Sequence, residues 1–183
     1  MTHTDIEIIQ KCLNGNRNAY ELLVRKYEKQ IASRMWRFSR DPGTCEALVQ
    51  EVFVDAFFSL KTYRSEAPFL NWLSRIATRV GYRHWKRETA SAAPVSTQTY
   101  RNADDERANH EAEKAGEIVH ELLRHLEPED RLILTLMYFE ECTAEEIAVR
   151  LNCSRGRIKM RAHRAKKRLR QLMEEYHGPD QTI

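Results

Sequence analysis

Glycine, proline and long apolar runs are all scarce in this sequence. Its 183 residues include six glycines and five prolines, while 31% are charged, a composition typical of a soluble, globular and mainly helical chain. No apolar run approaches the length that crosses a bilayer. The first residues, MTHTDIEIIQ, lack the basic and apolar segments of an export signal. We therefore expect no membrane insertion and a cytoplasmic location.

Clustered cysteines and histidines are also missing, which argues against a disulfide framework, a metal site and a catalytic centre. The four cysteines have no close pair, so we expect reduced, partly buried thiols at Cys12, Cys45, Cys142 and Cys153. Two of these with His163 match no zinc-ligand spacing. The seven histidines are dispersed, and neither an HExxH motif nor a glycine-rich phosphate loop occurs. The sequence therefore predicts no metal, no cofactor and no enzymatic activity.

The first 88 residues carry the apolar periodicity of amphipathic helices. Helices are predicted at about residues 6–13, from Asn18 as the N-cap to about residue 38, at about 45–60 and at about 69–87. The segments 39–44 (SRDPGT) and 61–68 (KTYRSEAP) are predicted loops, because proline and glycine interrupt regular structure. Together these elements predict a first helical domain over residues 1–88.

The composition changes after residue 88. Residues 89–114 are polar and have no apolar periodicity until near their end, which predicts a flexible linker with helix only at that end. A second helical domain is predicted over residues 115–177. Pro128 indicates one helix start, Thr143 and Glu146 have the spacing of a capping box before a short helix, and Ser154 can cap the last helix.

This last helix is strongly basic. Residues 154–170, SRGRIKMRAHRAKKRLR, hold nine Lys or Arg and no acid, yet Ile158, Ala162 and Ala165 recur at helical spacing. With the short helix at about 144–151 they predict a helix-turn-helix whose free face enters a DNA major groove. Residues near the helix start would read bases, and later ones would contact phosphates. The candidate readers are Arg155, Arg157, Lys159, Met160 and His163, and the candidate phosphate contacts are Arg161, Arg164, Lys167 and Arg168.

A solvated surface helix, an RNA-binding helix and a membrane-surface helix are the alternatives for this segment. A merely solvated face usually mixes charges of both signs. A membrane-surface helix needs bulky apolar residues where this seam has alanines. The pattern therefore favours DNA.

The predicted helix at 69–87 and the loop before it interleave aromatic and basic side chains. Aromatic rings stack on unpaired bases and cations follow the backbone, so this combination favours single-stranded nucleic acid. The alternative is that Trp72 and Trp85 belong to the core. The interleaved residues are Tyr63, Arg64, Phe69, Trp72, Arg75, Arg79, Tyr82, Arg83, Trp85, Lys86 and Arg87.

Several longer stretches occur together in this one chain. The first half contains GNRNAYELLVRKY, ALVQEVFVDAF and FLNWLSRIATRVGYRHWKR, and the second contains LEPEDRLILTLMYFEECTAEEIAVRLNCSRGRIKMRAHRAKKRLRQL. These stretches resemble regions two and four of small bacterial sigma factors of the extracytoplasmic-function (ECF) type. The resemblance covers nearly the whole chain apart from the predicted linker.

The resemblance implies a transcription initiation factor that binds core RNA polymerase and directs it to promoters. It assigns polymerase binding to Gln50, Glu51 and Asp55. It assigns the melted −10 element to Tyr63, Arg64, Trp72, Arg75, Arg79, Arg83 and Lys86. It assigns the −35 duplex to Arg155, Arg157, Lys159, Met160, Arg161, His163, Arg164 and Lys167.

The resemblance also implies an anti-sigma inhibitor as a partner, and the apolar Val54 and Phe58, predicted to lie outside the core, suit that role. This sequence departs from the family at Ala47, where an acid is usual, although Glu46 is adjacent. It also departs at Met160, where a small polar residue is common.

The overall expectation is an all-α protein with two helical domains joined by a flexible linker, the second containing the helix-turn-helix. The alternative function is a stand-alone helix-turn-helix transcriptional regulator whose first domain senses a signal or dimerises. The two differ in whether tight, site-specific DNA binding requires core polymerase.

Overall fold

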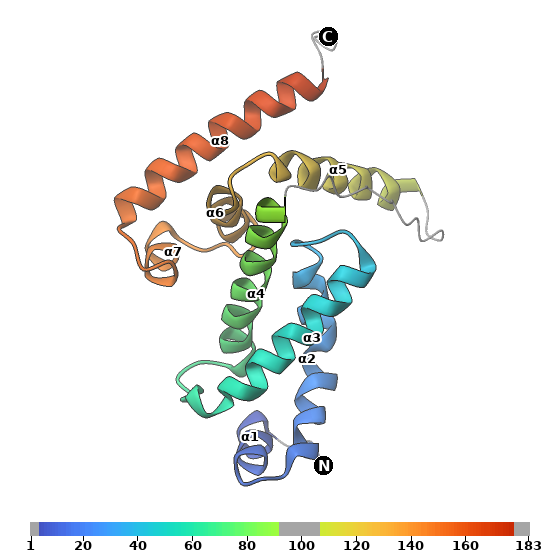
Figure 1. Cartoon of the computed structure of the whole chain (residues 1–183), viewed down its shortest axis with the longest axis vertical. Coiled ribbons are helices and arrows are strands. Elements are labelled where there is room, and N and C mark those ends of the chain that lie inside the picture. The colour runs from blue at the N-terminus through green and yellow to red at the C-terminus, as the bar shows by residue number, and fades with distance from the viewer. Residues whose placement is uncertain (1–3, 92–106, 178–183) are drawn as a thin grey trace. The chain divides into compact units, whose positions relative to one another are not determined.

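Every regular element in residues 4–91 and 107–177, the residues that this computed structural model describes, is a helix (Figure 1). The all-α prediction is confirmed. The chain divides into two units, Met1–Arg101 and Asn102–Ile183. Helix α4 continues to Ser91 and α5 begins at Arg107, so most of the predicted linker at 89–114 lies outside the described residues. No helix in the described ranges is long and apolar enough to span a membrane.

The first unit is built from helices that begin at side-chain caps. Thr4 forms a capping box with Glu7 before α1, Asn16 caps a short 3-10 helix, and Asp41 caps α3. In chain order the elements are α1 (Asp5–Leu13), the 3-10 helix Arg17–Ala19, α2 (Tyr20–Met35), α3 (Pro42–Ser59), the 3-10 helix Leu60–Thr62 and α4 (Phe69–Ser91).

Two predicted boundaries in this unit are wrong. The loop predicted at 39–44 ends early, because Pro42 occupies the first turn of α3, where its missing N–H removes no helical hydrogen bond. The cap predicted at Asn18 lies instead at Asn16, whose side-chain oxygen accepts from the Ala19 backbone N–H at 3.3 Å. The first difference comes from proline, which begins a helix here although it usually interrupts one, and the second is a choice between two asparagines two positions apart.

Helices α2, α3 and α4 bury their apolar faces against one another. The least exposed residues of this core are Leu23, Ile31, Met35, Val52, Ala56, Leu73, Ile76, Ala77 and Val80. The apolar residues that recur at helical spacing along α4, Leu73, Ile76, Ala77 and Val80, are among them, so the buried face of this helix is the one that its apolar periodicity indicates.

Trp85 belongs to this core as well. Its ring centroid lies 4.5 Å from that of Phe38, and its indole N–H donates to the Phe38 backbone oxygen at 2.8 Å. Gly81 allows this arrangement, because a Cβ there would overlap the Phe38 ring. Trp85 is 1% exposed, so the core alternative holds for it, whereas Trp72 is only partly buried. Phe69 is also 1% exposed, so neither Trp85 nor Phe69 can stack on a base.

The second unit contains the predicted helix-turn-helix. Its elements are α5 (Arg107–Arg124), α6 (Pro128–Tyr138), α7 (Ala144–Arg150) and α8 (Arg155–His177). The predicted caps are confirmed: Glu146 N–H donates to the Thr143 hydroxyl at 3.3 Å, and Arg157 N–H donates to the Ser154 hydroxyl at 3.2 Å. Leucines of α5 and α6 pack against α8 in a core of Leu122, Leu123, Leu126, Leu134, Ala165 and Leu172.

Candidate nucleic-acid interface

Helix α8 has one buried face and one exposed face. Ile147 of α7 and Ile158 of α8 are both 0% exposed, and Ala162 and Ala165 continue the seam. The turn between the helices passes through Asn152, whose φ of 50° is left-handed and suits asparagine better than most residues. Because packing occupies the inner face of α8, its polar residues lie on the outer face.

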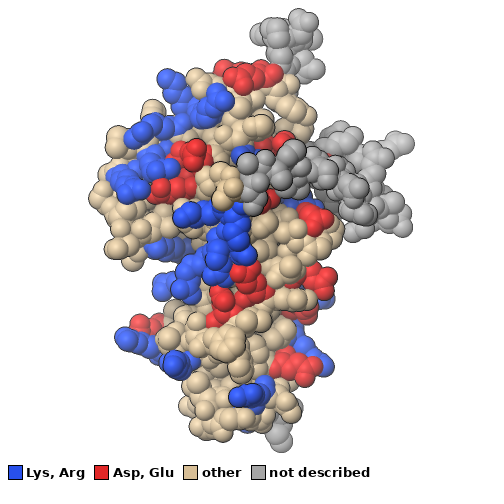
Figure 2. Space-filling model, viewed as in Figure 1, with Lys and Arg blue, Asp and Glu red and all other residues tan. Residues whose placement is uncertain are grey.

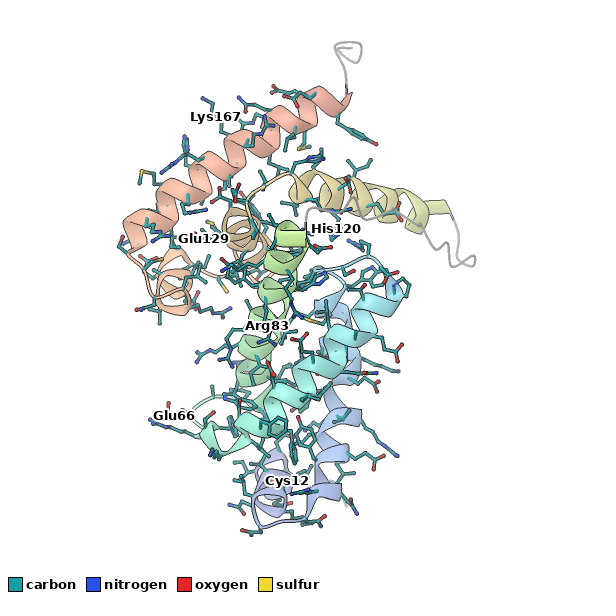
Figure 3. All side chains as sticks on the ribbon, in the orientation of Figure 1. Cys12, Glu66, Arg83, His120, Glu129 and Lys167 are labelled. Atoms are coloured by element: carbon teal, nitrogen blue, oxygen red, sulfur yellow. The ribbon has the colours of Figure 1, made fainter. Side chains whose placement is uncertain are left out.

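The outer face carries most of the residues predicted to bind the −35 element. Figure 2 shows Lys and Arg gathered over α8, and Figure 3 shows Lys167 pointing away from the helix. Four of these side chains form no ion pair with the residues that the structure describes: Lys159, His163, Arg164 and Lys167. Seven predicted residues are exposed, namely Arg155, Arg157, Lys159, Met160, His163, Arg164 and Lys167.

Three arginines of α8 are paired with acids of neighbouring helices, and a fourth, Arg168, lies 3.8 Å from Glu175 within α8. Arg157 Nη2 lies 3.1 Å from Glu129 Oε1 of α6. Arg161 contacts Glu129 at 2.8 Å and Asp130 at 2.6 Å, and only 25% of its side chain is exposed. Arg155 pairs with Glu145 of α7. The sequence suggests an unrelieved run of positive charge, but acids from neighbouring helices offset part of it.

A cluster of aromatic rings holds the loop before α4. The Tyr63 ring lies edge-on to Phe69 with centroids 5.4 Å apart and 5.6 Å from Trp72. The Tyr63 hydroxyl donates to the Ala67 backbone oxygen at 2.7 Å. This bond closes a loop whose tip residue, Ser65, has a left-handed φ of 58°. Arg64 is exposed beside it, while Tyr63 and Trp72 are partly buried.

The exposed side of α4 carries the predicted cations. Arg75, Arg79 and Lys86 are exposed, and the Lys86 ammonium lies 5.7 Å from the centre of the Tyr82 ring. Arg83 instead turns to α3, where it contacts Glu51 at 2.6 Å and Asp55 at 2.9 Å. Hydrogen bonding to Asp55 and Glu51 raises the pKa of Arg83.

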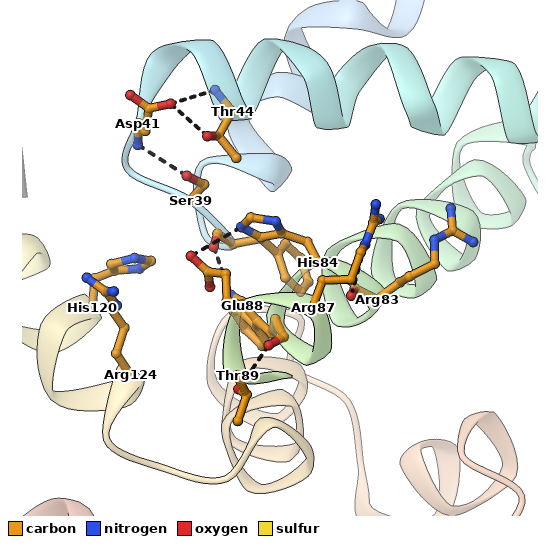
Figure 4. A network of polar contacts seen from close by, with 12 residues as sticks. Ser39, Asp41, Thr44, Arg83, His84, Arg87, Glu88, Thr89, His120 and Arg124 are labelled. Carbon is orange, nitrogen blue, oxygen red and sulfur yellow. Dashed lines mark hydrogen bonds and ion pairs between the residues drawn. The ribbon is translucent and has the colours of Figure 1, made fainter. Parts of the chain in front are cut away.

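The structure therefore brings together residues that were assigned to two different partners. Arg87, which was assigned to neither, joins them with a 3.0 Å contact to Glu51. Figure 4 shows Arg83 and Arg87 on one side of α4 and His84 and Glu88 on another, with His84 Nε2 3.6 Å from Glu88 Oε1. Gln50, the third residue predicted to bind polymerase, is exposed on α3.

Helix α3 also exposes large apolar side chains. Val54 is 53% and Phe58 75% exposed, and they are one helical turn apart. Both lie outside the core, as the sequence predicts. A separate groove of about 410 Å³ between α2 and α3 includes Trp36 and Val49 in its lining.

No disulfide joins the four cysteines, and the described part of the chain has no cluster of three or more His, Cys, Asp or Glu suited to a metal. Sequence reasoning missed Glu129, Asp130 and Arg87 as members of the charged clusters. Two acids directly after Pro128, in the first turn of α6, were a signal for the first pair. The pairing of Arg87 with α3 depends on the packing of two helices and had no local signal.

Two protein-family models match this chain. The model described as "Sigma-70 region 2" matches residues 23–91, and the one described as "Sigma-70, region 4" matches residues 116–169. Among similar curated proteins, RNA polymerase sigma-H factor of Pseudomonas aeruginosa is 28% identical over 93% of this chain and 94% of its own length. The ECF RNA polymerase sigma-E factor of Escherichia coli K12 is 26% identical over 89% of this chain and 91% of its own.

Solved structures share the fold. CnrH in complex with the cytosolic domain of CnrY superposes with a TM-score of 0.59 and 22% identity, covering 92% of this chain and 96% of that one. RpoE in complex with the anti-sigma factor NepR from Bartonella quintana also gives a TM-score of 0.59, with 18% identity, over 84% of this chain and 96% of that one.

The chain belongs to the sigma-70 family, because both matched models describe regions of that family and together they cover most of its residues. Within the family it is a small sigma factor of the ECF type. It directs RNA polymerase to promoters. Sigma factors are transcription initiation factors rather than enzymes.

Proposed function

We propose that the second unit binds the −35 element by placing the outer face of α8 in the major groove. Arg155, Arg157, Lys159, Met160 and His163 lie at the start of the helix, where base edges come within reach. Arg can fork onto guanine and Met can contact a thymine methyl group. Arg164 and Lys167 lie further along and neutralise phosphates. The observation that carries this proposal is the contrast between the buried seam at Ile158 and the exposed cations opposite it.

The first unit binds the melted −10 element. The loop at 61–68, including Tyr63 and Arg64, takes an unstacked base, and Trp72 packs beside it. The exposed cations of α4 then follow the strand: Arg75, Arg79, Arg83 and Lys86. Stacking on an aromatic ring contributes roughly 1–3 kcal/mol per base. Contacts with the buried Phe69 and with each other hold the partly buried rings of Tyr63 and Trp72 in place, which supports a preformed platform made of these two rings.

Core RNA polymerase binds α3 through Gln50, Glu51 and Asp55. All three lie on the solvent side of a helix whose other face is core. The linker at 89–114 then tethers a domain at 1–88 to one at 115–177, so that the two promoter elements are bound at the same time. Tethering raises the effective concentration of the second contact once the first has formed.

An anti-sigma protein covers part of this surface when the factor is inactive. The two similar structures are complexes of CnrH with the cytosolic domain of CnrY and of the sigma factor RpoE with the anti-sigma factor NepR. Val54 and Phe58 offer an exposed apolar pair for such a partner. The chain itself performs no catalysis and acts in the cytoplasm, where its polymerase and DNA lie.

A gel-shift assay with promoter duplex, with and without core polymerase, tests the proposal. We expect weak binding by the chain alone and strong, site-specific binding with core polymerase. A stand-alone helix-turn-helix regulator would instead bind its site tightly without polymerase, and that result would overturn the proposal.

A further inference from the structure

One carboxylate of α6 contacts two arginines of α8. Glu129 lies 3.1 Å from Arg157 through Oε1 and 2.8 Å from Arg161 through Oε2. Its neighbour Asp130 accepts from Arg161 Nε at 2.6 Å. Glu129 and Asp130 stand in the first turn of α6, where the helix dipole stabilises negative charge. Figure 3 shows Glu129 on α6 beside α8.

The two arginines differ in how much of each remains available. Arg161 is paired with both acids and its side chain is only 25% exposed. We therefore expect it to connect α6 to α8 rather than to contact a phosphate. Within the residues that the structure describes, the Arg157 side chain pairs with Glu129 alone, and it is 54% exposed. It lines a hollow of about 300 Å³ on the outer face of α8, together with Asp130, Met160, Arg161 and Arg164.

The geometry leaves Arg157 able to read a base while its orientation is fixed. Glu129 contacts only the Nη2 atom of Arg157, and a guanidinium has five N–H donors in a rigid plane. The remaining donors can fork onto the two acceptors of a guanine edge. Without the ion pair to Glu129, the arginine side chain could equally turn to a phosphate, which would give affinity without sequence preference.

We propose that Glu129 is a positioning residue for base readout, which fixes the guanidinium plane of Arg157 so that it discriminates guanine at one base pair of the −35 element. This inference rests on the proposed function of α8. It has a distinctive signature. Because Glu129 is itself negative, it opposes phosphate binding, so its removal lowers base discrimination while leaving non-specific affinity unchanged or higher. A residue that only stabilised the fold would lower both together.

The test measures base preference at each −35 position with holoenzyme assembled from core polymerase and each variant, using a duplex library randomised over the element. The wild type is expected to prefer guanine at one position, and Arg157→Ala and Arg157→Lys to lose that preference. Glu129→Gln should reduce it about tenfold, within the range that one arginine–guanine fork provides, and leave other positions unchanged. Asp130→Asn is the matched control, because Asp130 forms its ion pair with Arg161 and none with Arg157 within the described residues, and should retain the preference.

The double variant Glu129→Gln with Arg157→Ala separates positioning from direct contact. Positioning predicts no loss of preference beyond that of Arg157→Ala alone. A further change in that background would mean that Glu129 touches a base, and would overturn the inference. So would a Glu129→Gln variant with full guanine preference, or one with equal losses at every position and a lowered melting temperature. If the wild type shows no preference at any −35 position, the proposed function of α8 itself fails.

Discussion

Arg83 of α4 contacts Glu51 of α3 at 2.6 Å, and this contact joins two proposed binding surfaces. Glu51 is assigned to core polymerase and Arg83 to the −10 strand. Arg87 shares the same carboxylate at 3.0 Å, and Asp55 adds a second acid at 2.9 Å from Arg83. In the isolated chain, therefore, acids pair with Arg83, which is proposed to bind the −10 strand. We expect polymerase to release Arg83 when it binds Glu51 and Asp55.

This relationship predicts that Glu51→Gln raises the affinity of the isolated chain for single-stranded −10 DNA. Exposed ion pairs contribute about 0–1 kcal/mol, so the rise should not exceed about fivefold. Fluorescence anisotropy with a labelled −10 oligonucleotide at low salt measures it. Glu21→Gln is the matched control, because it removes one exposed acid that pairs with Arg25 within α2. Equal affinities for both variants would contradict the coupling.

The same variant should bind core polymerase more weakly than the wild type. Glu51 is proposed to contact polymerase directly, so loss of its charge removes an interaction that Gln cannot replace. Competition for core polymerase against a labelled wild-type chain measures the change. Unchanged competition would mean that Glu51 does not contact polymerase. It would not bear on the contacts of Glu51 with Arg83 and Arg87.

The two tryptophans of α4 should behave in opposite ways on substitution. Trp85→Ala should destabilise the first unit by about 3–5 kcal/mol, because it leaves a cavity beside Phe38 and an unpaired carbonyl. Trp72→Ala should cost far less stability but impair promoter opening. Urea unfolding followed by tryptophan fluorescence reports on the first unit alone, since Trp36, Trp72 and Trp85 are the only tryptophans of the chain.

Permanganate footprinting of the −10 element completes this comparison. An unchanged open-complex signal for Trp72→Ala would contradict a role in holding melted DNA. A Trp85→Ala variant as stable as the wild type would contradict the core packing described for α4.

Features that depend on residues close together in the sequence were predicted, and features that depend on distant residues were not. The α4 core face, the capping box at Thr143 and the seam at Ile158 depend on residues a few positions apart, and the structure confirms them. The start of α3 was missed because Pro42 is a helix interrupter in most positions and a helix starter in one.

Ion pairs between different helices could not be predicted from the sequence. No spacing rule connects Arg161 to Asp130 or Arg83 to Glu51, which are about thirty residues apart and meet only after the helices pack. Trp85 was ambiguous for a related reason: its position among exposed arginines suited a surface, while the ring itself fills the space beside Phe38.

Tyr63, whose hydroxyl closes the loop at 61–68, gives a further prediction. Tyr63→Phe keeps the ring against Phe69 and Trp72 but loses the hydrogen bond to the Ala67 oxygen. We expect a small loss of stability, about 1 kcal/mol, together with reduced discrimination at the −10 base that the loop accepts. Base-by-base substitution of a −10 oligonucleotide, bound to holoenzyme, measures that discrimination. An unchanged base preference would mean that the loop does not depend on this bond.

The cap of α3 predicts how stability changes with pH. Hydrogen bonds from the Thr44 hydroxyl and backbone N–H lower the pKa of Asp41, as Figure 4 shows for the two contacts. The unfolded chain therefore takes up this proton first as the pH falls, so the stabilisation is complete above about pH 4 and is lost as the pH drops through the lowered pKa. Asp41→Ala should cost about 1 kcal/mol at pH 7.

Thermal unfolding from pH 7 to 2.5, followed by tryptophan fluorescence, checks this prediction. The difference between wild type and Asp41→Ala should shrink on the acid side. Asp41→Asn retains a capping oxygen without a titrating group, so it should lack that part of the acid-side loss. A difference between wild type and Asp41→Ala that stays constant over the whole range would contradict the assignment.

We propose that this chain selects promoters for core RNA polymerase through two separate DNA contacts. Sequencing the 5′ ends of transcripts made in vitro from genomic DNA, by core polymerase with and without the chain, tests it most directly. We expect a discrete set of new start sites that share one −10 and one −35 element, and we expect Arg157→Ala to alter the −35 element alone. The same start sites with and without the chain would contradict it.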